Sequence, residues 1–218
     1  MNIKEIFYSF QGEGPLVGYP QIFIRFYGCN IHCAYCDEPD FVKDKHNYTV
    51  DRVLEELKPL LKLKPHSISI TGGEPLIQVD ALKELLPHLT LPVYLETNGT
   101  LPKHLAEVAD LITYFSVDYK HGFDKEFLAF LDVIKGYKNV FVKYVLIRDF
   151  PIEDVRKMSK IMAAFDPNMP LIIQPVTPFS EIKVKATPAD IQKAFNLASA
   201  HLKDVRIIPQ THKFMGLR

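Results

Sequence analysis

The stretch GCNIHCAYCD, at 28–37, contains all three cysteines of this 218-residue chain. It follows the run QIFIRFYG at 21–28, whose β-branched and aromatic residues are typical of a buried strand. An odd number of cysteines cannot all pair within one chain, and thiols gathered in one short loop more often bind metal. The stretch therefore predicts a fold in which a buried strand carries a metal-binding loop to one edge of a sheet.

The composition is that of a globular protein without a dominant charge. Hydrophobic residues make up 47% of the chain, and 26 lysines and arginines balance 26 aspartates and glutamates. This balance argues against bulk binding to nucleic acid or to an anionic membrane. No apolar run is long enough to predict a membrane span, and the first residues do not resemble a signal peptide. We therefore expect a cytoplasmic protein with reduced thiols.

Outward from the cysteines, the chain alternates between strand-like and helix-like segments. Strands are predicted at 21–28, 66–72, 92–98, 111–118, 139–147, 170–176 and 204–210. Helices are predicted at 49–63, 79–89, 125–136, 151–165 and 188–202. Thr49 and Thr187 are the expected N-caps of the first and last helices, and Pro59 is expected to kink the first helix or end it early.

This alternation predicts one α/β domain over 1–218 with a mainly parallel sheet. The sheet could be a doubly wound open sheet or an incomplete barrel, and both place the functional site at the carboxyl ends of the strands. The cysteine loop, expected at about 28–47, is the longest stretch without a predicted helix or strand. A loop of that length inside a compact domain is usually functional.

The spacing of Cys29, Cys33 and Cys36 leaves more than one chemistry open. A zinc site takes four ligands, and His32 is poorly placed as the fourth because it adjoins Cys33. A four-iron cluster held by three thiolates would keep one iron open for a ligand. Three incidental buried thiols are the remaining alternative, which their close spacing in one loop disfavours.

Two motifs resemble the radical S-adenosylmethionine (SAM) superfamily. The first is C-x3-C-x2-C with an aromatic residue, Tyr35, before the last cysteine, and the second is TGGEP at 71–75. The resemblance implies a truncated, partial (β/α) barrel in which the three cysteines hold a [4Fe-4S] cluster and SAM chelates the open iron. The reduced cluster would cleave SAM to a 5′-deoxyadenosyl radical. The paired glycines allow a close approach to the ligand, and Glu74 is expected to accept from its ammonium group.

Further segments resemble the 7-carboxy-7-deazaguanine synthases. They are SFQGEG at 9–14, GYP at 18–20, FIRF at 23–26, ETNGT at 96–100, VDYK at 117–120, QP at 174–175 and PQTHKFMG at 209–216. The resemblance implies conversion of 6-carboxy-5,6,7,8-tetrahydropterin to 7-carboxy-7-deazaguanine with loss of ammonia, in queuosine-type deazapurine biosynthesis. It also implies SAM regeneration, magnesium as a cofactor, a homodimer, and a flavodoxin-like or other electron donor.

The same resemblance implies roles for individual residues. The SAM contacts it implies are Tyr35, Cys36, Asp37, Gly73, Asp118, Tyr119, Lys120 and Gln174. The substrate contacts it implies are Gln11, Gly12, Glu13, Arg25, Thr71 and His212. Arg25 lies in an otherwise apolar strand, where a buried guanidinium needs an anion, either the substrate carboxylate or an internal partner. QGEG could instead be a glycine-bracketed turn, and 212–213 could belong to a solvated tail.

Two positions depart from the family pattern. Glu38 stands where the family has a magnesium-binding threonine; a carboxylate suits that cation, so Glu38 is the candidate ligand, and loss of the metal site is the alternative. Asp118 and Tyr119 replace a Ser-Pro pair. Two rival functions stay open: an activase that generates a glycyl radical on a partner protein, and a non-enzymatic iron–sulfur or zinc module. The activases lack the QGEG and Arg25 segments, and such a module does not need a full α/β domain.

Overall fold

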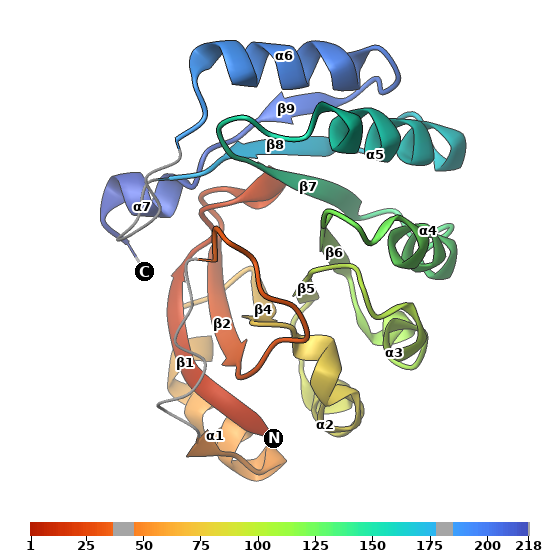
Figure 1. Cartoon of the computed structure of the whole chain (residues 1–218). Helices are drawn as coiled ribbons and strands as arrows, with labels where there is room; N and C mark the ends of the chain where they lie inside the picture. The colour runs from red at the N-terminus through yellow and green to blue at the C-terminus, as the bar shows by residue number, and fades with distance from the viewer. Residues whose placement is uncertain (37–45, 178–184, 218) are drawn as a thin grey trace.

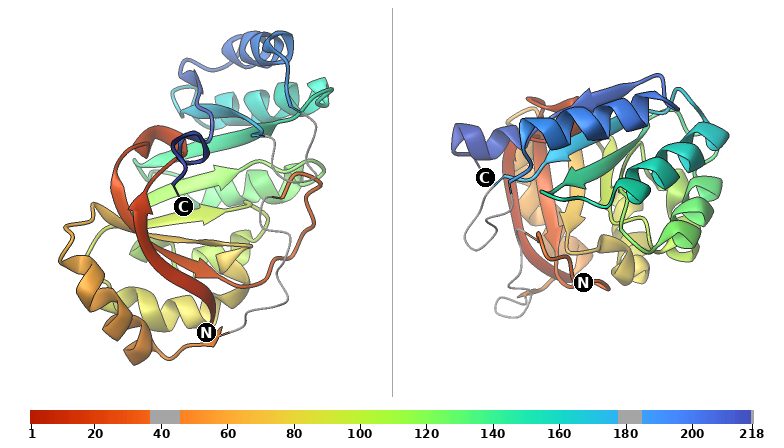
Figure 2. Two further views of the ribbon diagram at one scale, coloured as in Figure 1. Left: turned by 90° about the vertical axis from the view of Figure 1, so that its left-hand side faces the viewer. Right: turned by 45° about the horizontal axis from the view of Figure 1, so that its top comes forward.

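The computed structural model describes residues 1–36, 46–177 and 185–217. In these ranges the strands form one sheet in the order β3-β1-β2-β4-β5-β6-β7-β8-β9. From β2 to β9 neighbouring strands are parallel, whereas β1 and β3 are antiparallel additions at one edge. Figures 1 and 2 show the strongly curved sheet, with most of the helices along its outer side and α7 apart from them. The edge strands β3 and β9 do not pair, so the predicted partial barrel is confirmed.

The predicted strands and helices are all present, although most are shorter than expected. The strands are β1 (Asn2–Phe10), β2 (Pro20–Phe26), β3 (His46–Asn47), β4 (Ser67–Gly72), β5 (Val93–Thr97), β6 (Tyr114–Asp118), β7 (Val140–Leu146), β8 (Leu171–Pro175) and β9 (Val205–Ile207). The α-helices are α1 (Val50–Leu61), α2 (Val79–Leu85), α3 (Pro102–Ala106), α4 (Asp124–Val133), α5 (Ile152–Phe165), α6 (Pro188–Ser199) and α7 (Thr211–Met215). Elements β1, β3, α3 and α7 were not predicted.

Both expected helix N-caps are confirmed. The Thr49 hydroxyl accepts the Arg52 backbone N–H, and Thr187 forms a reciprocal capping box with Asp190. The effect expected of Pro59 is smaller than predicted, because α1 runs on to Leu61. Pro59 is exposed, so the carbonyl that it leaves without a donor faces solvent. None of the helices in the described ranges has the length and apolar character needed to span a bilayer.

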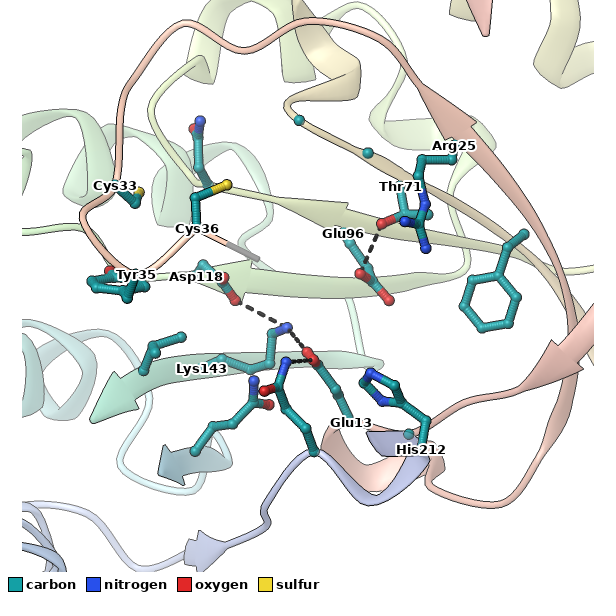
Figure 3. A pocket seen from close by; sticks show the side chains of 18 of the residues that line it. Glu13, Arg25, Cys33, Tyr35, Cys36, Thr71, Glu96, Asp118, Lys143 and His212 are labelled. Atoms are coloured by element: carbon teal, nitrogen blue, oxygen red, sulfur yellow. Dashed lines mark hydrogen bonds and ion pairs between the residues drawn. The ribbon is translucent and has the colours of Figure 1, made fainter. Parts of the chain in front are cut away.

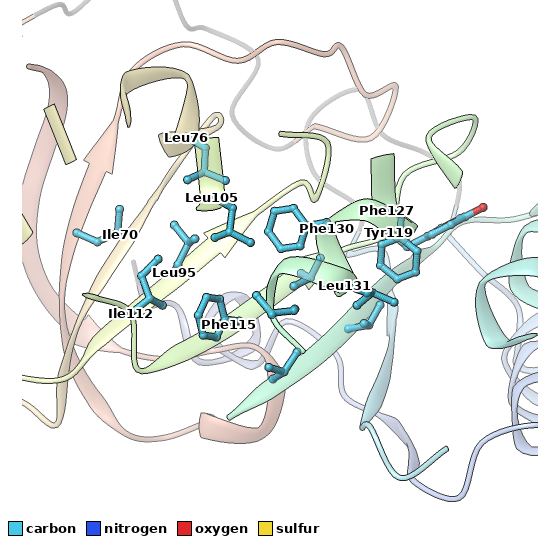
Figure 4. Packing of buried hydrophobic residues seen from close by; sticks show 14 of the residues in the cluster. Ile70, Leu76, Leu95, Leu105, Ile112, Phe115, Tyr119, Phe127, Phe130 and Leu131 are labelled. Atoms are coloured by element: carbon cyan, nitrogen blue, oxygen red, sulfur yellow. The ribbon is translucent and has the colours of Figure 1, made fainter. Parts of the chain in front are cut away.

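The outer face of the sheet packs against the helices. In a strand, alternate residues point to the same side, and Ile68, Ile70, Leu95 and Phe115 lie on the helix-facing side of their strands. Figure 4 shows several of these residues against Leu105 of α3 and against Phe127, Phe130 and Leu131 of α4. This packing forms the main hydrophobic core and fixes which strand positions face the interior.

The inner face changes character along the strands. Near the amino ends, Tyr94, Phe141 and Ile172 form a second, smaller apolar cluster. Two residues further along the same strands, the inward positions are Glu96, Lys143 and Gln174, which line a cavity. The period of two therefore fills the bottom of the half-barrel with apolar groups and leaves polar groups at its mouth.

Candidate active site

A cavity of about 1130 Å³ lies at the carboxyl ends of the parallel strands. Neighbouring strands each contribute a polar side chain to it: Arg25 from β2, Thr71 from β4, Glu96 from β5, Asp118 from β6, Lys143 from β7 and Gln174 from β8. Figure 3 shows the cysteine loop on one side of this ring and Arg25 and Thr71 on the other. The site therefore lies at the predicted edge of the sheet.

All three cysteines line the cavity as partly exposed thiols that form no disulfide with one another. The described part of their loop contains neither helix nor strand, and its start is anchored by the Glu74 N–H, which donates to the Gly28 carbonyl over 2.8 Å. Burial raises the pKa of the Cys33 thiol, and the Lys120 charge partly offsets that rise. Within the described ranges, no set of three or more His, Cys, Asp or Glu side chains is already gathered around a possible metal position.

The donor set nevertheless fits a [4Fe-4S] cluster. Three thiols reach one cavity from one irregular loop, so the sulfur atoms can be gathered by movement within the loop alone. Cys29 also has a fixed neighbour, because the Asn98 side-chain amide donates to its Sγ over 3.9 Å and to Asn30 Oδ1 over 2.9 Å. The loop is thus tied to the sheet beside its first cysteine.

The glycine turn approaches the cysteine loop closely. Gly72 has a φ of +130°, and a Cβ there would lie 2.0 Å from the Phe26 carbonyl oxygen, so only glycine fits at this position. Gly73 lines the cavity, as expected.

The prediction for Glu74 is wrong. Its carboxylate is fully buried away from the cavity and accepts hydrogen bonds from Leu76, Thr97 and Asn98. Glu74 is the N-cap of the 3-10 helix Pro75–Gln78, so its side chain turns back toward that helix.

Several residues predicted to contact SAM gather near the cysteines. Lys120 Nζ lies 3.2 Å from Asp118 Oδ2 and 5.2 Å from the centre of the Tyr35 ring. Burial lowers the pKa of Lys120, but the combined attraction of Asp118, Tyr35 and Cys33 raises it above its ordinary value. Gln174 Oε1 is buried and accepts no hydrogen bond from the described residues, which fits a donor on a bound ligand. Lys120, Tyr35 and Gln174 are thus placed where SAM could be held.

Tyr119 does not line the cavity, so its contact with SAM stays a prediction, and two further predicted residues lie outside the described part of the chain. Tyr119 lies outside the cavity lining and packs against Phe127 and Tyr144, with its hydroxyl donating to Asp124. The period of two turns Asp118 and Lys120 inward, so Tyr119 between them faces the helices. Asp37 and Glu38 lie outside the described residues.

The predicted substrate residues all line the cavity, and Figure 3 shows Glu13, Arg25, Thr71 and His212 on the side away from Cys33 and Cys36. Gln11 donates to Glu96 Oε1 over 3.0 Å, and the Thr71 hydroxyl donates to Glu96 Oε2 over 2.9 Å. Burial raises the pKa of Glu96. The Gln11 carbonyl Oε1 accepts the Glu13 backbone N–H over 3.0 Å, so the segment 11–13 is a turn held in place by the first residue's side chain.

Arg25 lines the cavity with a side chain that is 21% exposed. Its Nε lies 3.4 Å from Glu5 Oε1, and the guanidinium stacks 5.4 Å from the centre of the Phe7 ring. The internal ion pair that sequence reasoning kept as an alternative is therefore present.

Residues near the carboxyl terminus close one wall of the cavity. The Gly12 carbonyl accepts the Thr211 backbone N–H over 2.9 Å, and a Cβ at Gly12 would lie 2.1 Å from His212 Nδ1. Helix α7 therefore packs on the 11–13 turn. The alternative of a solvated tail is wrong for His212, which lines the cavity.

Sequence reasoning assigned no site role to four lining residues: Glu96, Asn98, Lys143 and Gln210. Lys143 carried a usable signal, because it is a cation inside an apolar strand, as Arg25 is. Its Nζ lies 2.5 Å from Glu13 Oε2 and 3.3 Å from Asp118 Oδ1. Burial would raise the pKa of Glu13, but Lys143 holds it below its ordinary value.

Comparisons with known proteins agree with this geometry. Residues 23–159 match the radical SAM superfamily. The chain is 36% identical to a 7-carboxy-7-deazaguanine synthase of Geobacter sulfurreducens, over 99% of this chain and 97% of the relative. It is 35% identical to the synthase of Methanothermobacter thermautotrophicus, over the same shares of the two chains.

A solved structure matches the fold. The crystal structure of QueE from Escherichia coli superimposes with a TM-score of 0.67 over 96% of this chain and 93% of that chain, at 20% sequence identity. At that identity the likeness bears on the fold alone. Sequence identity over nearly the whole chain, together with the superfamily match, shows that this protein belongs to the 7-carboxy-7-deazaguanine synthase family of radical SAM enzymes.

Proposed function

We propose that this protein converts 6-carboxy-5,6,7,8-tetrahydropterin to 7-carboxy-7-deazaguanine with loss of ammonia, as a carbon–nitrogen lyase of deazapurine biosynthesis. One observation carries the proposal: a single cavity is lined by the three cysteines and the glycine turn, and also by the amide and carboxylate groups of the 11–13 turn and by an arginine. A cofactor and an anionic heterocycle could therefore lie next to each other in it.

One group of residues would bind the cluster and SAM. Cys29, Cys33 and Cys36 would hold the [4Fe-4S] cluster, which together with SAM supplies a 5′-deoxyadenosyl radical for hydrogen abstraction from the pterin C6. Lys120 offers a cation to the SAM carboxylate, and Gln174 offers a free acceptor. These residues would hold and orient the cofactor so that the adenosyl radical forms close to the pterin C6.

The substrate side has complementary groups for both ends of the pterin. The Arg25 guanidinium can form a fork on the substrate carboxylate, which a lysine could not match in geometry. The Glu13 carboxylate and the Gln11 amide can bind the donor and acceptor edge of the ring. His212 of α7 forms the wall beside them and limits access of water.

Magnesium belongs to the family's chemistry, and we propose Glu38 as its ligand in this chain. A carboxylate is a stronger ligand for this hard cation than the hydroxyl that it replaces. The Glu38→Ala variant should lose the dependence of its rate on magnesium. A rate that responds to magnesium as the wild type does would show that Glu38 is not a ligand.

We further propose that the enzyme is a homodimer and that a flavodoxin-like or other small redox protein reduces its cluster. Sedimentation of the reconstituted protein tests the first proposal. Reduction of the cluster by candidate donors tests the second.

The deciding assay is anaerobic. Reconstituted enzyme receives dithionite, SAM and 6-carboxytetrahydropterin, and mass spectrometry detects the product. Formation of 7-carboxy-7-deazaguanine supports the whole proposal. Formation of 5′-deoxyadenosine alone would overturn the pterin assignment and reopen the glycyl-radical activase alternative, which the relatives do not favour. Neither product from a loaded cluster would overturn the radical chemistry as well.

A further inference from the structure

We infer that Lys143 is a positioning residue: it holds the Glu13 carboxylate in its direction and in its ionised form, and thereby strengthens the binding of the pterin ring by Glu13. The inference rests on the proposed function and deepens it. Lys143 lies in the middle of β7 with a side chain that is 5% exposed. Its ammonium group contacts Glu13 and Asp118, which reach it from opposite sides (Figure 3).

The buried charges form an alternating row. Glu13, Lys143, Asp118 and Lys120 follow one another, with successive contacts of 2.5, 3.3 and 3.2 Å. A buried ammonium is costly unless carboxylates compensate it, and here each interior member of the row has a partner on both sides. Two positive and two negative charges cancel, so the row is neutral only while Lys143 is present.

Glu13 is also held in direction. Its Oε2 accepts from Lys143 over 2.5 Å, and its Oε1 accepts from Gln210 Nε2 over 2.8 Å. Each carboxylate oxygen has a second lone pair, which stays available to N–H donors of a ligand in the cavity. The Lys143 ammonium group is directed to Glu13 and Asp118 and its side chain is 5% exposed, so we expect it to act on a ligand through Glu13.

The charged groups around Glu13 show what removal of Lys143 would do. Asp118 of β6 and Glu96 of β5 are carboxylates that interact with Glu13, Gln210 is neutral, and His212 of α7 packs on the neighbouring Gly12. Without Lys143, burial and the two nearby carboxylates would all favour a proton on Glu13. A protonated Glu13 loses one of the acceptor sites that it offers to a ring donor.

The experiment compares Lys143→Met with Lys143→Arg in the reconstituted holoenzyme. Lys138→Met is the matched control, because Lys138 is exposed just before β7. At neutral pH, K143M should lower kcat/KM for the pterin about 30-fold or more, mainly through KM. Formation of 5′-deoxyadenosine without substrate should fall much less than kcat/KM does, because Asp118 keeps its contact with Lys120. K143R, which keeps the charge, should recover part of the loss, and K138M should match wild type.

The pH profile separates positioning from a purely structural role. In K143M the pKa of Glu13 should be raised, so kcat/KM should increase with pH through the neutral range as Glu13 loses its proton. In the wild type Glu13 is already ionised there, so its titration should not change kcat/KM. An unchanged KM and profile in K143M would overturn the inference. So would an equal loss of substrate turnover and of 5′-deoxyadenosine formation, because that would indicate a disturbed fold.

A second readout is independent of the substrate. If wild type makes no product, the proposed function fails. The inference about Lys143 can still be tested, by comparing the infrared spectrum of K143M with that of the double variant that also carries Glu13→Gln. At neutral pH, the difference between these two spectra should contain the carbonyl band of a protonated carboxylic acid, which is that of Glu13. The difference between wild type and Glu13→Gln alone, in which Lys143 is present, should lack this band. Absence of that band in K143M would overturn the inference.

Discussion

The Glu74 carboxylate accepts the backbone N–H of Asn98 over 2.6 Å, and this bond joins two turns that meet at the cysteine loop. Glu74 belongs to the glycine turn after β4, and Asn98 to the turn after β5. The Asn98 side chain in turn donates to Cys29 Sγ and Asn30 Oδ1. A buried residue without access to the cavity thus positions the first cysteine.

Removal of the Glu74 carboxylate should destabilise the fold. Glu74→Ala leaves the Leu76 and Asn98 N–H groups without their acceptor in a buried place, which typically costs about 2–4 kcal/mol in total. Denaturant unfolding of the cluster-free protein measures the loss. Glu84→Ala, an exposed change on α2, is the control and should stay within about 0.5 kcal/mol of wild type. Equal stability of the two variants would contradict this account of Glu74.

Glu74 should also make stability depend on pH. Burial raises its pKa from 4.5 to about 7, so between these values the folded state binds more protons than the unfolded state. Stability must then fall as pH rises through this range, by up to about 3 kcal/mol from this group. Glu74→Gln does not titrate there, so the stability difference, wild type minus variant, should shrink by that amount from pH 4.5 to pH 7. A constant difference would show that the pKa of Glu74 is not raised.

The sheet and the cysteine site could be predicted because their signals are local. Apolar runs and helical periods mark the parallel strands and the long helices, and the spacing of the three cysteines indicates a metal-binding site. Strand β1 was missed because its residues mix charged and apolar types, and its place is fixed by pairing with β2. Helix α7 is only a short segment, held by the contact of Thr211 with Gly12.

For two site residues, sequence reasoning placed the residue correctly along the chain but not the direction of its side chain. Glu74 and Tyr119 both stand at strand ends, as predicted, yet their side chains turn away from the cavity. Strand alternation was sufficient to turn Tyr119 outward, and it would equally have turned Lys143 inward. The hydrogen bonds of Glu74 depend on a turn 24 residues away in sequence, which no local pattern contains.

Gly72→Ala should disrupt the junction of β2 and β4. The new Cβ would lie 2.0 Å from the Phe26 carbonyl oxygen, and this neighbour is backbone that cannot swing aside. We expect a loss of about 3 kcal/mol or more in unfolding free energy, together with poor iron incorporation on reconstitution. Gly122→Ala is the matched control, because it also has a positive φ but opens into free space, so it should cost only about 1 kcal/mol. Similar losses in the two variants would mean that the close approach at Gly72 is unimportant.

Arg25→Ala should separate substrate binding from cofactor chemistry. Loss of a fork on a carboxylate should lower kcat/KM for the pterin about 100-fold, whereas uncoupled SAM cleavage should persist. Arg25→Lys should fall between the two, since it keeps the charge without the fork. The Glu5 ion pair offers the competing explanation. Loss of iron and of uncoupled cleavage in Arg25→Ala would show that Arg25 serves the fold instead.

Gly12→Ala should act on the enzyme through His212. A Cβ at Gly12 would lie 2.1 Å from His212 Nδ1 and 2.5 Å from its Cβ, so the imidazole and α7 must move away from the cavity. We expect a KM for the pterin that is raised about tenfold, with only a small loss in unfolding free energy, because the short helix α7 near the carboxyl terminus can shift to relieve the clash.

A double-mutant cycle tests this mechanism. If Gly12→Ala acts by displacing His212, then adding it to His212→Gly should raise KM no further, because both the ring and the Cβ that would clash are already gone. Movement of α7 in Gly12→Ala would also strain the bond from the Thr211 N–H to the Gly12 carbonyl, and removal of the His212 side chain relieves that strain together with the clash. Additive effects of the two changes on KM would instead mean that the new methyl group blocks the substrate directly, and that His212 contributes to binding independently of the turn beneath it.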